Sequence, residues 1–120
     1  MYGSILIATD GSELSDKAVD QGLALAKVVG AKVTILRVTS QPAPMVYEGI
    51  VVALPVEEIA DEIAKNVEKY FVTLRAKASN IGVDAETIQI ENDFPWQVII
   101  DTARDKGAAL IVMASHGRRG

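Results

Sequence analysis

Residues 110–120 read LIVMASHGRRG, and this stretch carries the strongest indication of the fold. An apolar run bounded by glycines is typical of a buried strand. The Gly-x-x-Gly segment that follows, from Gly117 to Gly120, predicts a loop whose exposed backbone amides can donate hydrogen bonds to a ligand. Such loops normally open a helix whose N-terminus completes an anion site. Because the sequence stops at Gly120, we expect a single domain over residues 1–120 that is incomplete at its C-terminus.

Earlier apolar runs predict more strands, and amphipathic segments between them predict helices. The strands are expected at residues 4–9, 32–38, 84–90 and 109–114. The helices are expected at residues 13–29, from Pro55 to about Ile81, and from Pro95 to Gly107. This alternation indicates an α/β fold, an open parallel sheet flanked by helices and joined by right-handed crossovers.

Helical spacing also predicts the buried face of each helix. The predicted buried residues, by helix in chain order, are Ala18, Gly22, Leu25 and Val29; Ile59, Ile63, Val67, Phe71, Leu74, Ala78 and Ile81; and Trp96, Ile99, Ile100 and Ala103. Trp96 and its neighbour Phe94 are expected in the core or at an interface. Nothing basic surrounds them, so a platform for stacking nucleic-acid bases is not indicated.

A long connection, residues 39–54, interrupts this regular alternation. Pro42 and Pro44 prevent regular structure early in it, and loops of this length in a compact domain are usually functional or mobile. Residues 45–54 are too apolar for a free linker. We expect this segment to close partly over a ligand or to pack against a neighbouring subunit.

Composition narrows the classes of function. The net charge of −4 argues against a nucleic-acid partner, because phosphate backbones require a basic face. The absence of cysteine excludes disulfides and thiolate metal sites and fits a reducing cytosol. The N-terminus has no signal-peptide pattern, and no apolar run reaches membrane-spanning length. These features predict a cytoplasmic protein that does not enter a membrane.

Asp10 is the carboxylate directly after the first predicted strand, at the edge where ligands bind in such sheets. Two interpretations carry equal weight. Asp10 could accept hydrogen bonds from a ribose or help to hold a hydrated cation. Alternatively, Asp10, Gly11 and Ser12 only shape the turn, and Ser12 caps the following helix.

The loop after the last strand offers a second group of candidates. Gly117 and Gly120 allow a close backbone approach to phosphate, although Gly-x-x-Gly alone is a weak signal. Arg118 and Arg119 could contact phosphate oxygens or could be solvated cations. His116 has no partners in the sequence for a metal site or a nucleophile pair, so we expect it to be a loop residue that lines a pocket.

Three separated segments, ILIATDGSELS, ILRV and LIVMASHGRRG, together resemble the universal stress protein family. The resemblance covers the whole chain and implies five parallel strands in the order 3-2-1-4-5, of which this chain supplies 3-2-1-4. One family branch binds ATP or a related adenine nucleotide through Gly-x-x-Gly followed, after a spacer, by Gly and Ser or Thr. The other branch lacks this motif. Gly117 and Gly120 match its first half, and Ala114 departs from the glycine of many binders.

The resemblance implies that an adenine nucleotide lies in one crevice, with Mg²⁺ or Mn²⁺ held through its phosphates and by Asp10. The implied contacts are Ala8, Asp10, Val38, Met113, Ala114, His116, Gly117, Arg118 and Gly120. It also implies a homodimer in the intact protein.

Three classes of function follow. The first is an ATP-binding stress sensor or signalling module, and the second is a nucleotide-independent dimeric interaction module. The third, catalysis, is limited to slow ATP hydrolysis. Residues 8–12 are similar to a phosphatase signature, but Ala8 occupies the position of its nucleophilic aspartate.

Overall fold

The computed structural model describes residues 3–40, 45–52 and 55–115 of the chain. Its main sheet has four parallel strands in the order β5-β2-β1-β6. Counted in chain order within this sheet, that is the predicted 3-2-1-4 arrangement. The elements are β1 (Ser4–Ala8), α1 (Glu13–Val29), β2 (Lys32–Thr39), β3 (Met45–Tyr47), β4 (Ile50–Val52), α2 (Val56–Asn80), β5 (Ala85–Glu91), α3 (Pro95–Asp105) and β6 (Ala108–Met113).

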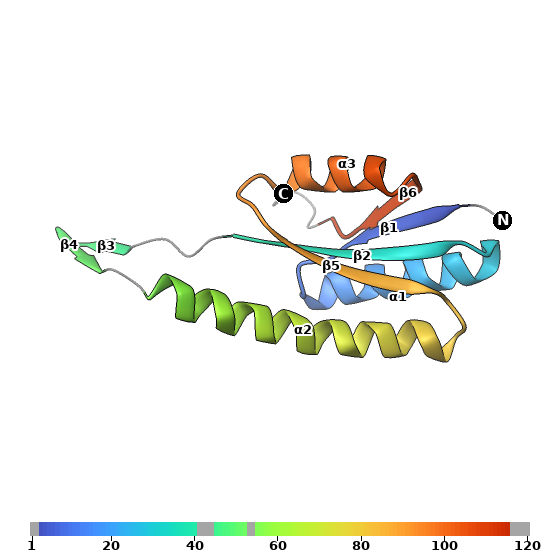
Figure 1. Cartoon of the computed structure of the whole chain (residues 1–120), viewed down its shortest axis with the longest axis horizontal. Helices are drawn as coiled ribbons and strands as arrows, with labels where there is room; N and C mark the ends of the chain where they lie inside the picture. Colours follow the sequence, from blue (N-terminus) through green and yellow to red (C-terminus); the bar gives the residue numbers. More distant parts are fainter. Residues whose placement is uncertain (1–2, 41–44, 53–54, 116–120) are drawn as a thin grey trace.

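Helices cover both faces of this sheet, α1 and α2 on one side and α3 on the other (Figure 1). Side chains alternate along β1 in the way that a strand buried on both faces requires. Ile5 and Ile7 pack with α1 and α2, whereas Leu6 and Ala8 pack with α3. The predicted α/β fold is therefore confirmed, and the sheet separates two apolar layers.

Two of the three helices are rotated relative to the predicted faces. Leu25 of α1 is exposed, because the buried stripe of this helix runs through Val19 and Leu23 instead. In α3, Trp96 and Ile100 are 65% and 50% exposed. The residues that α3 does bury are Val98, Ile99, Thr102 and Ala103.

Helix α1 approaches the sheet closely at Gly22, which belongs to both the predicted and the observed face. A Cβ atom at this position would lie 2.6 Å from Ile7 Cδ1 and 3.0 Å from Ile7 Cγ1. The helix therefore lies against β1 along the line through Gly22. Leu23 and Leu25 are two residues apart on a helix of about 3.6 residues per turn, so they point to nearly opposite sides.

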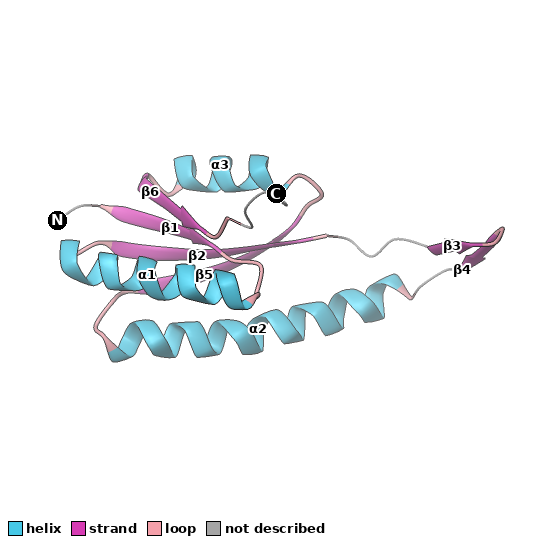
Figure 2. Cartoon of the chain, turned by 180° about the vertical axis from the view of Figure 1, so that it is seen from behind, coloured by secondary structure: helices cyan, strands magenta, loops and turns pink. Residues whose placement is uncertain are grey.

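Helix α2 behaves largely as predicted. Val67, Phe71, Leu74 and Ala78 are buried against the sheet. Its N-terminal part extends past the end of the sheet (Figure 2), where Ile59 and Ile63 are only half-buried. Ile81, at the other end, is exposed, so the predicted stripe is too long at both ends.

The long connection contains a β-hairpin that sequence analysis did not predict. Strands β3 and β4 pair antiparallel, with Tyr47 opposite Ile50. Glu48 and Gly49 form the turn between them with φ of 50° and 78°. Positive φ at both central residues is the geometry of a type I′ turn, which matches the twist of the flanking strands. Residues 41–44 and 53–54 of the connection lie outside the described part of the chain.

We predict that Gly22→Val lowers the free energy of unfolding by about 1–3 kcal/mol, because overpacking displaces Ile7 from a filled core. Valine favours the helix slightly more than glycine, so any loss must come from packing. Denaturant unfolding would measure it.

Ala24→Val is the matched control, at an exposed position of the same helix. It should change the free energy of unfolding by less than about 0.7 kcal/mol. Equal stability of the Gly22→Val variant and the control would contradict the close approach.

Candidate functional site

A cavity of about 180 Å³ lies at the carboxyl ends of β1, β2 and β6. The chain runs from β1 to β2 on one side of β1, whereas β6 pairs on its other side. This is the switch point at which open α/β sheets bind ligands. The lining residues are Ala8, Thr9, Asp10, Ser15, Leu36, Val38, Pro95, Ile99, Met113 and Ala114.

The structure brings together five of the residues predicted for the site. They are Ala8, Asp10, Val38, Met113 and Ala114. The other four predicted residues, His116, Gly117, Arg118 and Gly120, lie outside the described residues. The expected partial closure of the long connection over a ligand stays a prediction; residues 39–40 and 46–52, whose side chains are described, do not line the cavity.

The turn after β1 holds Asp10 in a fixed position. Its Oδ1 atom accepts hydrogen bonds from the Ser12 amide at 2.9 Å and from the Ser15 hydroxyl at 2.5 Å. The Ser12 hydroxyl in turn accepts from the Ser15 amide at 3.1 Å and caps α1. Asp10 therefore shapes the turn, and Ser12 caps α1 as predicted. Asp10 also lines the cavity, so the ligand-binding interpretation stays a prediction beside this one.

Sequence analysis missed the cavity residues that the helices contribute. Ser15 lies on the first turn of α1, and Pro95 and Ile99 lie one turn apart on α3. The spacing of Pro95 and Ile99 places both on one side of the helix. The spacing of Pro95 and Ile99 is visible in the sequence, but only the fold shows that this side of α3 borders the ends of β1 and β2.

A second hydrogen-bonded chain connects the same turn to α2. The Gly11 amide donates to Thr9 Oγ1 at 3.1 Å, and Thr9 Oγ1 lies 2.9 Å from the Tyr70 hydroxyl. The Tyr70 hydroxyl donates to Asp16 Oδ1 at 2.5 Å. Burial, together with this bond to the Asp16 carboxylate, raises the pKa of Tyr70 to about 12. The turn is thus attached to two helices by side-chain hydrogen bonds.

The described residues offer little for a metal held by protein alone. They contain no group of three or more histidine, cysteine or acidic side chains that could bind an ion. Asp10 is the carboxylate among the lining residues of the cavity. None of the helices in the described part of the chain is both long and apolar enough to span a bilayer.

The comparison with known families agrees with this geometry. The model of the Universal stress protein family matches residues 1–120. The chain belongs to the universal stress protein family. The resemblance seen in the three sequence segments is therefore confirmed, and the fold of this universal stress protein can be compared with that of its relatives.

Universal stress protein YxiE from Bacillus subtilis is 36% identical over 127 residues, which cover 100% of this chain and 83% of the relative. A crystal structure from the same family, from Burkholderia pseudomallei, superimposes with a TM-score of 0.79 at 25% identity. That match covers 96% of this chain and 83% of the other.

Two further structures of this fold were determined with adenine nucleotides. One is a universal stress protein in complex with cAMP, with a TM-score of 0.69 and 23% identity over 93% of this chain and 75% of that one. The other is a family protein from Arabidopsis thaliana with AMP bound, with a TM-score of 0.65 and 21% identity over 97% and 78%.

We predict that Tyr70→Phe removes the tyrosine that ionises at about pH 12. The free energy of unfolding of this variant should therefore fall less between pH 10 and about pH 12 than that of the unaltered protein. The folded state raises this pKa from 10.0, so the contribution of Tyr70 to stability is complete below pH 10 and is lost as the pH rises through about 12. Ultraviolet titration of phenolate and unfolding curves across this range would measure both effects.

Tyr47→Phe is the matched control, because Tyr47 lies in the hairpin and is 71% exposed. The late-titrating component should persist in this variant. If it persisted in Tyr70→Phe instead, the hydrogen-bonded chain from Thr9 to Asp16 would be wrong.

Proposed function

We propose that this protein binds ATP or a related adenine nucleotide in the cavity beside Asp10 and acts as a stress-response sensor or signalling module. The observation that supports the proposal most directly is the composition of that cavity. A fixed carboxylate lies at the switch point of the sheet, beside apolar walls contributed by Val38, Ile99 and Met113. A planar base requires such walls, and ribose hydroxyls require an acceptor such as Asp10.

The size of the cavity suggests how a nucleotide would lie in it. Pockets that enclose a drug-sized ligand measure roughly 300–1,000 Å³, and this cavity measures about 180 Å³. In the proposal, the cavity takes the base and part of the ribose, and the phosphates extend out of it. By family resemblance, His116, Gly117, Arg118 and Gly120 would approach those phosphates. A Mg²⁺ or Mn²⁺ ion would be held chiefly by phosphate oxygens, with Asp10 as the protein carboxylate.

The nucleotides recorded for relatives support the ligand class. Two proteins with this fold bind cAMP and AMP in their structures. Both proteins share less than a quarter of their residues with this chain, so they support an adenine nucleotide in general and do not select ATP. Catalysis in this proposal is limited to slow hydrolysis, because Asp10 is the one candidate general base that the described cavity offers.

We predict that Asp10→Asn weakens ATP binding about tenfold or more in magnesium buffer. Asparagine keeps the Oδ1 acceptor for Ser12 and Ser15, so the turn is retained while the charge and one acceptor are lost. Isothermal titration calorimetry on the two proteins would measure the change.

Asp105→Asn makes the same charge change at an exposed position near the end of α3 and should leave ATP affinity unchanged. No ATP binding by the unaltered protein would refute the proposal. Equal weakening by both variants would point to a general charge effect.

A second candidate function, a nucleotide-independent dimeric interaction module, is favoured by the β3–β4 hairpin. Val46 and Val51 are directly paired on it and are 69% and 65% exposed. Two-stranded hairpins are marginally stable alone in water, and exposed apolar side chains gain from being covered. In this alternative, the hairpin packs against a second copy of the protein.

We predict for this alternative that Val46→Lys combined with Val51→Lys weakens self-association about tenfold or more without changing ATP affinity. Lysine keeps the aliphatic stem but places a charge on the paired face. Sedimentation equilibrium would measure the association constant.

Glu48→Lys serves as the control, since it adds positive charge at the turn without removing an apolar side chain. A double variant that associates as strongly as this control would exclude the hairpin as the dimer surface.

A further inference from the structure

Arg37 of β2 is a charged side chain on the face of the sheet that α1 and α2 cover. Its neighbour Leu36 packs with the α3 layer, so strand alternation turns Arg37 toward α1 and α2. The guanidinium lies directly under the β1–α1 turn, where a Cβ atom on Gly11 would be 2.9 Å from Nη1. Gly11 has φ of 82° and no side chain, which leaves room for this cation beneath the loop.

Two nitrogens of this guanidinium lack partners. Nε and Nη1 of Arg37 are buried and have no hydrogen-bond acceptor among the described residues. Buried polar groups in native proteins are almost always hydrogen-bonded, and a buried cation without an acceptor is unfavourable. The guanidinium therefore has hydrogen-bonding capacity that no described residue uses.

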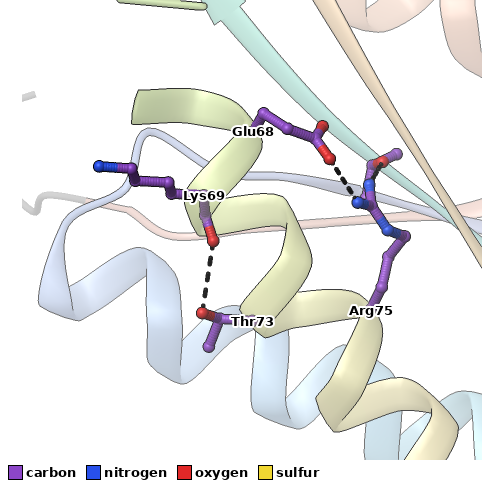
Figure 3. Close-up of polar contacts among 5 residues, drawn as sticks. Glu68, Lys69, Thr73 and Arg75 are labelled. Carbon is purple, nitrogen blue, oxygen red and sulfur yellow. Dashed lines mark hydrogen bonds and ion pairs between the residues drawn. The ribbon is translucent and has the colours of Figure 1, made fainter. Parts of the chain in front are cut away.

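Arg75 shows what a satisfied arginine looks like on the same side of the sheet. Its Nη2 lies 2.6 Å from Glu68 Oε2 within α2 (Figure 3). Its Nη1 donates to Thr87 Oγ1 of β5 at 2.6 Å. Among the described residues, Arg37 has neither kind of contact.

Asp10 lines the same groove as Arg37, and its Oδ1 accepts hydrogen bonds from Ser12 and Ser15. The ion pairs between described residues involve Arg75, Lys77, Arg104 and Lys106, and none includes Arg37.

An open groove of about 220 Å³ borders this cation. Its lining residues are Asp10, Gly11, Arg37, Asn66, Val67 and Tyr70. Asn66 is exposed on α2 and carries an amide with two N–H donors. The groove lies on the α1–α2 side of the sheet, whereas the cavity with Val38 and Ile99 lies on the α3 side. Asp10 lines both.

We propose that this groove is a second ligand site, which binds a phosphoryl oxyanion through the guanidinium of Arg37 and the amide of Asn66. A guanidinium offers several N–H donors in a plane and suits phosphate oxygens better than any other side chain. The oxyanion is either free phosphate or the phosphate tail of a nucleotide that crosses the β1–α1 turn. The site itself does not depend on the proposed nucleotide function.

The first test measures binding of inorganic phosphate by calorimetry at constant ionic strength, with the full chain and its Arg37→Gln and Asn66→Ala variants. Phosphate is expected to bind the unaltered protein, about tenfold or more weakly to Arg37→Gln and several-fold more weakly to Asn66→Ala. Arg75→Gln is the matched control and should bind phosphate normally. Circular dichroism confirms folding, and Arg37→Gln removes an unpaired charge, so it should fold.

The second test identifies the source of the oxyanion by titrating ATP and adenosine into the same proteins. A nucleotide tail in the groove predicts that phosphate competes with ATP and that Arg37→Gln weakens ATP but not adenosine. A site for free phosphate predicts that ATP and phosphate bind at the same time and that Arg37→Gln leaves ATP affinity unchanged.

Equal affinities of the unaltered protein and Arg37→Gln for phosphate and for ATP would overturn the proposal. A protein that binds phosphate but no ATP would refute only the nucleotide function.

Discussion

The hydrogen bonds to one carboxylate oxygen, Asp10 Oδ1, hold the turn on which the rest of the site depends. Ser12 and Ser15 donate these bonds, and Ser12 also caps α1, so the helix begins where the carboxylate fixes the chain. β1 is paired by parallel strands on both sides and is buried on both faces. A rigid central strand therefore ends in a rigid turn. The groups at the carboxyl edge of the sheet are positioned relative to this turn.

Strand alternation makes this one turn part of two different surfaces. Ala8 and Val38 face the α3 layer and line one cavity, while Arg37 faces α1 and α2 and lines the groove. The two surfaces meet at Asp10, which lines both. The Thr9–Tyr70 hydrogen bond attaches α2 to the same turn. A displacement of the turn would therefore affect both cavities and the contact of Thr9 with Tyr70 of α2.

The strands, the helix positions and the cavity edge were predictable because they depend on local pattern and on where parallel strands end. The rotation of the helices was not, since periodicity defines a stripe but contact with the sheet selects it, as Leu25 and Trp96 show. The strand-end rule found Asp10, whereas Ser15 and Ile99 reach the cavity from helices. The hairpin was missed because each of its strands has only three residues, too few for alternation to be recognised.

The acidic composition is consistent with the proposed anionic ligands, because the net charge acts at long range whereas a binding site acts through short-range contacts. The chain has 16 acidic and 12 basic residues, so it has no excess of positive charge for a nucleic acid. Salt screens interactions between exposed charges beyond about 8–10 Å, so the net charge matters little inside a cavity or groove. A half-buried guanidinium in lower dielectric acts more strongly on a neighbouring phosphate than a surface cation does. The net negative charge thus disfavours long polyanions, while it is compatible with the proposed small anion held by a few directed donors. Composition therefore limits the size of an anionic partner more than it limits the charge of one.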